Sequence, residues 1–171
     1  MDSMRVLMKA AASLPIALLA TCLVAACGSP GASPSASPSA PTSPAPSAAA
    51  LVPGCELAPA ALVKAHLGLT VSDPVATTTT KVTTCAYAIG SNPYGVLIRF
   101  QVGQDSASFA TGRAGFPATA NVSGLGDEAY SSVANLYTTL VARKGTTGIL
   151  ITSRATFVGE RSLMVVLLSK V

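Results

Sequence analysis

Residues 96–102 read Val-Leu-Ile-Arg-Phe-Gln-Val, and large apolar side chains occupy every second position. One face of such a stretch carries Val96, Ile98, Phe100 and Val102, and the other carries Leu97, Arg99 and Gln101. A period of two is typical of a β-strand whose one face is buried and whose other face is open. The stretch therefore predicts a half-buried strand of a sheet that is covered on one side.

Further elements are expected on both sides of this strand. Other strands are predicted up to residue 89, at 128–131, at 135–142 and at 147–153, with a hairpin at 143–146 and turns at 73–74, 91–95 and 124–127. Helices are predicted at 58–67, ended by Gly68, and after a cap at Asp105. Residues 162–170 fit a helix or a buried strand, and we expect a helix packed on the sheet. The fold class is α+β, with a mainly antiparallel sheet, flanking helices and one disulfide.

The globular part is expected to span residues 51–171, which is enough chain for one domain with one core. This part holds nine basic and six acidic residues, a net charge of +3. The charges are spread along the chain, with no more than two of one sign adjacent. A dispersed charge of this size is typical of a solvated surface and does not predict a nucleic-acid partner.

The first 27 residues carry the signs of a lipoprotein signal peptide. Arg5 and Lys9 precede an uncharged apolar run, which ends in Val-Ala-Ala before Cys27. The run is short for a membrane span and is typical of a signal peptide. Cys22 is a weaker lipidation site because Thr21 precedes it, whereas Ala26 precedes Cys27. We expect residues 1–26 to be removed and Cys27 to carry lipid, which would hold the chain on the outer face of the cell membrane. Ordinary secretion after cleavage is the alternative.

Residues 27–50 follow as the lipidated cysteine and a low-complexity tether. After Cys27 the tether contains only Ser, Ala, Pro, Gly and Thr, with six prolines and no charge. Such a composition has no apolar side chains to bury and predicts a disordered, partly polyproline-II spacer.

Cys55 and Cys85 are the cysteines that remain once Cys22 is removed and Cys27 is lipidated. Outside the cytoplasm, two such thiols in a small domain most simply form a disulfide. A redox pair or metal site is the alternative, but there is no CxxC motif, and His66 is the only histidine.

The chain resembles a family of actinobacterial lipoproteins catalogued as a domain of unknown function. The resemblance covers residues 51–171 and depends on Gly-Cys-Glu-Leu at 54–57, Cys-Ala-Tyr at 85–87 and Gly-Leu-Gly-Asp-Glu-Ala-Tyr at 124–130. The chain departs from the family at Ala58, where a Ser or Thr helix cap is common. The resemblance implies a single small α+β domain with a paired cysteine, a lipid anchor and no established activity.

The residues give no clear sign of catalysis. Gly124, Gly126 and Ala129 match a dinucleotide fingerprint in spacing, but a strand before them and a helix within them are not predicted. Asp127 and Glu128 are adjacent and would point to opposite sides of a strand. No common hydrolase, metalloprotease or P-loop motif occurs. We therefore expect no enzyme, no catalytic or metal-binding residues and no cofactor, although an enzyme with a dispersed site, using His66, is a third alternative.

The function expected from the sequence is a lipid-anchored, non-enzymatic domain that binds or carries an apolar small molecule or an envelope component. A concave sheet face would hold the ligand through Leu136, Leu140, Ile149 and Ile151, unless these residues are simply core. The alternative is a module that contacts proteins or the cell wall. Its candidate surface contact is the basic pair Arg143 and Lys144, expected at a hairpin tip.

Overall fold

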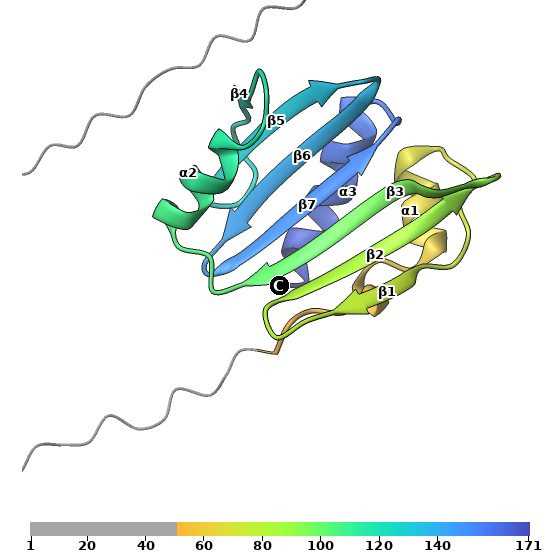
Figure 1. Ribbon diagram of the computed structural model, residues 1–171, viewed down its shortest axis with the longest axis horizontal. Coiled ribbons are helices and arrows are strands. Elements are labelled where there is room, and N and C mark those ends of the chain that lie inside the picture. The colour runs from red at the N-terminus through yellow and green to blue at the C-terminus, as the bar shows by residue number, and fades with distance from the viewer. Residues whose placement is uncertain (1–50) are drawn as a thin grey trace, which may run out of the picture. The chain divides into compact units, whose positions relative to one another are not determined.

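The structure is a computed structural model that describes residues 51–171 (Figure 1). The predicted signal peptide, the lipidation site Cys27 and the tether lie outside the described residues. Seven strands form one antiparallel sheet in the order β1-β2-β3-β7-β6-β5-β4. The strands are β1 Val75–Thr78, β2 Val82–Ile89, β3 Asn92–Val102, β4 Ala120–Asn121, β5 Glu128–Ala134, β6 Tyr137–Lys144 and β7 Thr147–Ser153.

Helices lie on both faces of this sheet, two α-helices on one face and one on the other (Figure 1). They are the 3₁₀ turn η1 Cys55–Leu57 and the α-helices α1 Ala60–Leu67, α2 Ser106–Ala114 and α3 Phe157–Ser169. Figure 1 shows α1 and α3 together behind the sheet, while α2 lies in front of it near β5 and β6. The predicted α+β class is confirmed. Within residues 51–171, none of the helices has the length and apolar character needed to cross a membrane.

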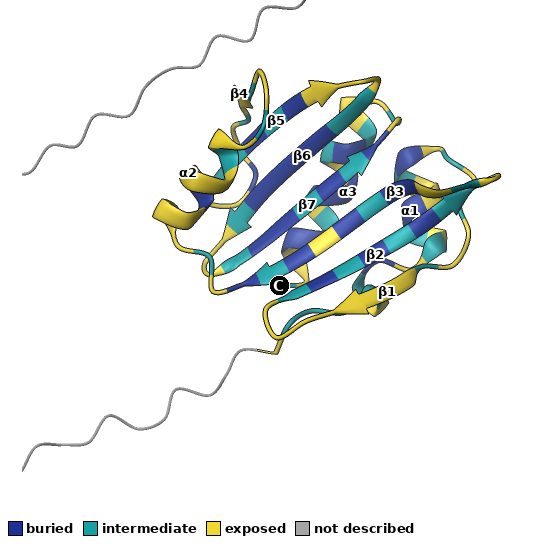
Figure 2. Ribbon diagram, viewed as in Figure 1, coloured by how far each residue is buried: buried dark blue, intermediate teal, exposed yellow. Residues whose placement is uncertain are grey.

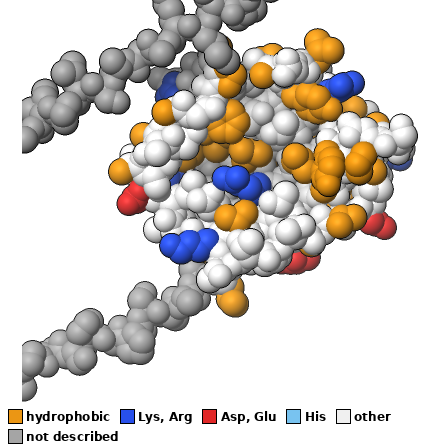
Figure 3. Space-filling view, viewed as in Figure 1, with side chains coloured by type: hydrophobic (Ala, Val, Ile, Leu, Met, Phe, Trp, Pro, Cys, Tyr) orange, Lys and Arg blue, Asp and Glu red, His pale blue; other side chains and the backbone are white. Residues whose placement is uncertain are grey.

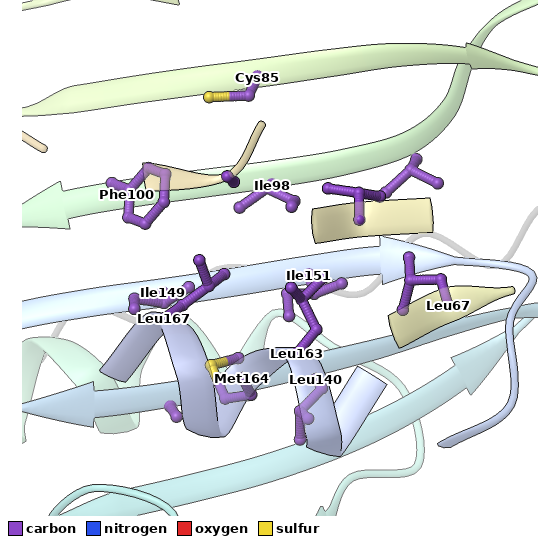
Figure 4. Packing of buried hydrophobic residues seen from close by; sticks show 14 of the residues in the cluster. Leu67, Cys85, Ile98, Phe100, Leu140, Ile149, Ile151, Leu163, Met164 and Leu167 are labelled. Carbon is purple, nitrogen blue, oxygen red and sulfur yellow. The ribbon is translucent and has the colours of Figure 1, made fainter. Parts of the chain in front are cut away.

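The face covered by α1 and α3 is the hydrophobic core. Ile98 of β3 pairs with Ile151 of β7, which pairs with Leu140 of β6, so these side chains form a row on one face. Figure 4 shows them with Leu163 and Leu167 of α3. All of these side chains are fully buried. The alternation at residues 96–102 therefore predicted the buried face correctly, and burial of this apolar surface is the main stabilising contribution.

The C-terminal segment is a helix, as expected, and begins earlier than residue 162. Thr156 is its N-cap, and its side chain accepts a hydrogen bond from Gly159 N. The predicted turn at residues 91–95 lies further upstream, because β3 already begins at Asn92 and Gly90 turns the chain with a φ of 58°. Pro93 sits next to a register irregularity between β2 and β3, where a proline is tolerated because the ladder is interrupted.

Cys55 and Cys85 form the predicted disulfide, with an S–S distance of 2.01 Å. The bond joins η1 to β2 across a sequence separation of 30 residues. Close by, the buried Tyr87 hydroxyl donates a hydrogen bond to the Ala58 carbonyl. The N-terminal segment of the domain is thereby fixed to the sheet at two neighbouring points before α1 begins.

One carboxyl group lies inside the core. Glu160 of α3 is fully buried, and Ser153 Oγ donates a hydrogen bond to its Oε1 over 2.6 Å. Its Oε2 is buried without a hydrogen-bond partner. Because burial disfavours the charged form, it raises the pKa of Glu160 to about 8, against the opposing effect of the Ser153 hydrogen bonds.

Candidate functional site

The side chains predicted to hold a ligand are not on the open face of the sheet. Leu140, Ile149 and Ile151 are fully buried beneath the helices on the other face. Leu136 is 82% exposed in the turn between β5 and β6. The predicted concave face with these four residues is therefore wrong, since the first three residues are core and the fourth is remote from them.

The opposite face of the sheet is only partly covered. Its central row crosses five adjacent strands and comprises Thr84, Arg99, Leu150, Val141 and Tyr130. Partners directly opposite in antiparallel strands have Cβ atoms about 5 Å apart, so these side chains form one continuous strip. Tyr130 and Val141 are buried, Thr84 and Leu150 are half-buried, and Arg99 is exposed (Figure 2).

Helix α2 covers one end of this strip. Asp105 caps it as predicted, since the Asp105 side chain accepts from Ser108 N and the Ser108 side chain accepts from Asp105 N. Phe109 is the buried residue of α2, and its ring meets the Tyr130 ring edge-on at 5.2 Å between centroids. The Phe109–Tyr130 contact therefore holds α2 against one end of the strip, and the sheet beyond it towards β2 is open.

A cavity of about 130 Å³ lies between α2 and the sheet. It is lined by Arg99, Gln101, Gln104, Phe109, Gly112, Phe116, Tyr130, Val141, Gly148, Ile149 and Leu150. Gly112 of α2 lines the cavity and is exposed, and a Cβ added there would meet no heavy atom within 4 Å, so a larger side chain has room at this position. The lining combines aromatic and aliphatic side chains with the polar side chains of Arg99, Gln101 and Gln104, so the cavity is mixed in polarity.

Arg99 is the cation at this cavity. Its Nη2 donates a 2.9 Å hydrogen bond to Gln101 Oε1, and among the described residues it forms no ion pair. Figure 3 shows the same face, with Lys or Arg and hydrophobic side chains in the middle and acidic side chains at the margins. A guanidinium keeps its charge at every relevant pH, so the open face has a fixed positive charge.

A second arginine holds the end of α2 in place. The Arg113 guanidinium lies 5.6 Å from the centre of the Tyr130 ring, and its Nε donates to Thr119 Oγ1 over 3.0 Å. Burial raises the pKa of Tyr130, and the positive charges of Arg113 and Arg99 act in the opposite direction. Arg113 therefore has partners in two other segments, Tyr130 and Thr119, whereas the hydrogen bond of Arg99 is to Gln101 of its own strand.

Arg143 and Lys144 are not at the hairpin tip where they were expected. Both belong to β6, and the turn is formed by residues 145–146. Arg143 has a side chain only 13% exposed and pairs with Asp127 at 3.3 Å and Glu128 at 3.2 Å. Lys144 Nζ donates to the carbonyl groups of Leu168 and Val171, both at 2.8 Å. The two charges thus stabilise the fold, and their role as a surface contact stays a prediction.

The Gly-Leu-Gly-Asp segment forms a turn. Gly124 and Gly126 have φ angles of 72° and 57°, a region that favours glycine. A Cβ at Gly126 would lie 2.2 Å from the Arg143 carbonyl oxygen, and Asp127 N donates to that oxygen over 2.7 Å. Strand β5 follows, where a dinucleotide site would need a helix. The segment therefore fixes the turn before β5 against β6.

His66 joins two helices. Its Nδ1 lies 2.8 Å from Ser162 Oγ of α3, and the side chain is half-buried. Among the described residues, the hydrogen-bond partner of His66 is this hydroxyl and not a carboxylate of the kind that orients the histidine of a catalytic triad. Within residues 51–171, no three His, Cys, Asp or Glu side chains come together as a metal site would require.

Comparisons with known proteins add little to this geometry. No protein-family model matches the chain, and a search of curated proteins finds no match. A crystal structure of a GTP binding regulator from Thermotoga maritima matches with a TM-score of 0.38 and 11% identity. That match covers 57% of this chain and 73% of the other. A likeness this distant carries no argument about fold or function.

Apart from Ile149, the residues that line the cavity were not predicted as a site. Arg99 was placed correctly on the open face of its strand, but nothing in its sequence neighbourhood shows that α2 lies beside it. The available signal is an arginine that stands between Ile98 and Phe100 in the strand.

Proposed function

We propose that this chain is an extracytoplasmic lipoprotein, held on the membrane by lipid on Cys27, whose globular domain binds a small ligand without chemical conversion. The Val-Ala-Ala sequence before Cys27, which is typical of a lipidation signal, supports the anchor, and the resemblance to actinobacterial lipoproteins agrees with it. The fold supports the binding role, because a stable disulfide-linked core carries an incompletely covered sheet face.

The observation that carries the binding role is the cavity between α2 and the sheet. It lies on the side of the sheet away from the main core, and α2 reaches it with a glycine where a larger side chain would fit. A glycine inside a helix lowers the stability of the protein by about 1 kcal/mol relative to alanine. A domain selected only for stability would therefore gain from a larger side chain at this position. An open space beside Arg99, which forms no ion pair within residues 51–171, is consistent with a ligand.

The anchor predicts a specific chemical result at Cys27. A full-length chain made in an actinobacterial host is expected to incorporate an alkyne-labelled palmitate and to remain in the membrane fraction. Cys27→Ser removes the thiol that accepts the diacylglycerol, so label incorporation should be abolished, whereas Cys22→Ser should incorporate label like the wild type. Labelling retained in Cys27→Ser would show that the lipid is elsewhere, and equal absence of label in all three would favour ordinary secretion.

The binding role predicts a retained mass. Native mass spectrometry of the full-length chain, extracted in detergent from the same host, is expected to show an added mass that denaturation removes. Gly112→Leu places a large side chain in the cavity and should lose that mass, because the ligand's space is filled. Ala107→Leu puts the same side chain at an exposed position of α2 and serves as the matched control.

Two outcomes would contradict the binding role. One is a wild-type chain that carries no added mass after extraction and after incubation with host lipid and metabolite extract. The other is an added mass that Gly112→Leu retains as fully as the control, which would place the ligand outside this cavity.

A further inference from the structure

We infer that the cavity between α2 and the sheet takes the carboxylate of a ligand built on a single ring, with Arg99 as the group that binds the negative charge. This inference rests on the proposed function, because it names the ligand class of the same site.

The size of the cavity limits the ligand to about one ring. An enclosed cavity of about 150 Å³ lined by aliphatic and aromatic side chains binds benzene. The cavity here has about 130 Å³ and is partly open to the solvent, so a group attached to the ring can extend outwards. A long acyl chain or a fused polycyclic lipid would require several times this volume.

The charge at the cavity favours a single negative group. Arg99 presents a guanidinium whose hydrogen bond to Gln101 uses Nη2, which leaves other N–H donors for a ligand. Two carboxylates in contact with α2 are already engaged, since Asp105 caps the helix and Glu128 accepts from Ser106 and Arg143. A carboxylate matches the planar guanidinium with two parallel hydrogen bonds. One cation balances one negative charge, so a doubly charged phosphate is a poorer fit.

The walls of the cavity favour a flat ring. Phe116 and Tyr130 have ring centroids 5.8 Å apart and planes inclined by 55°, and Leu150 lies in the sheet next to Arg99. Aromatic rings attract each other in tilted and edge-on arrangements of this kind. A ligand ring would therefore contact Phe116 or Tyr130 on one side and Leu150 on the other, with its carboxylate towards Arg99.

Sodium benzoate is the probe for this inference. Saturation-transfer NMR on the full-length chain in detergent, at low ionic strength, is expected to show binding of benzoate and at least tenfold weaker binding of neutral benzamide. Arg99→Gln should weaken benzoate binding at least tenfold and leave benzamide unchanged. Arg154→Gln is the matched control, because Arg154 is exposed and stacks on Tyr137, 4.8 Å from its ring centre, outside the cavity lining.

The outcomes separate this inference from the proposed function. Equal binding of benzoate and benzamide, unchanged in Arg99→Gln but lost in Gly112→Leu, would overturn the role of Arg99 while the cavity remained a binding site. Benzoate binding that survives Gly112→Leu would overturn the location. Failure of benzoate to bind, with a different ligand retained in native mass spectrometry, would overturn the ligand class alone.

Discussion

A chain with Cys55 replaced by Ala is expected to unfold with a free energy about 3–4 kcal/mol below that of the oxidised wild type. The Cys55–Cys85 bond closes a loop across 30 residues, so its loss gives the unfolded chain more conformational freedom. The bond also holds η1 against β2, next to the point where α1 begins. Cys55→Ala is the better variant, because Cys85 is fully buried. Leaving Cys85 unchanged keeps its sulfur in the core, so the variant loses the crosslink without opening a cavity.

Urea unfolding followed by circular dichroism, with and without reductant, measures this effect. Reduction should lower the free energy of unfolding of the wild type to nearly that of Cys55→Ala. The variant itself should unfold at the same urea concentration with and without reductant. Identical unfolding midpoints for the oxidised wild type and the variant would show that the crosslink does not stabilise the domain.

Glu160→Gln is expected to stabilise the protein at neutral and alkaline pH. The carboxyl titrates near 4.5 in the unfolded chain, and burial raises its pKa in the folded protein to about 8. Below pH 4.5 Glu160 is protonated in both the folded and the unfolded chain, and its contribution to the free energy of unfolding is most favourable. Between pH 4.5 and 8 the unfolded chain ionises and the folded protein does not, so stability falls by roughly 1 kcal/mol per pH unit. Above pH 8 the loss is complete.

An amide at residue 160 does not ionise and can still accept the hydrogen bond from Ser153. Its own NH₂ group would lie at a position that has no partner, which costs about 1–2 kcal/mol. The variant should therefore be no more stable than the wild type at pH 4 and more stable by on the order of 2 kcal/mol at pH 8. Urea midpoints from pH 4 to 9 test this, with Asp73→Asn as a control at an exposed carboxyl. Stability curves that run parallel for wild type and Glu160→Gln would contradict the buried, protonated carboxyl.

The sequence predicts this fold well where one local signal decides. The alternation at residues 96–102 predicts the strand and its buried face, and Asp105 and Gly68 predict helix ends that the structure contains. The hairpin strands are different, because Leu140-Val141-Ala142 and Ile149-Leu150-Ile151 are apolar on both faces. Which face receives α3 depends on packing from a distant part of the chain, so the choice of a ligand face from these residues failed.

The candidate site was beyond sequence reasoning for the same physical reason. Arg143 and Lys144 look free as adjacent residues, but their partners lie 15–27 residues away. Arg99 looks like an ordinary surface position of a strand, yet Gly112 of α2 and Phe116, which follows α2, line the same cavity. Pairing across the sheet and the position of α2 are non-local, and the sequence around each residue does not specify them.

A crystal structure of the full-length chain, purified from an actinobacterial expression host and crystallised in the presence of benzoate, tests the central claim most directly. We predict density for a non-protein group in the cavity between α2 and the sheet, with its carboxylate at Arg99 and its ring beside Leu150. A cavity that holds only water or the protein's own side chains, while a bound organic molecule lies elsewhere on the domain, would contradict the proposed binding site.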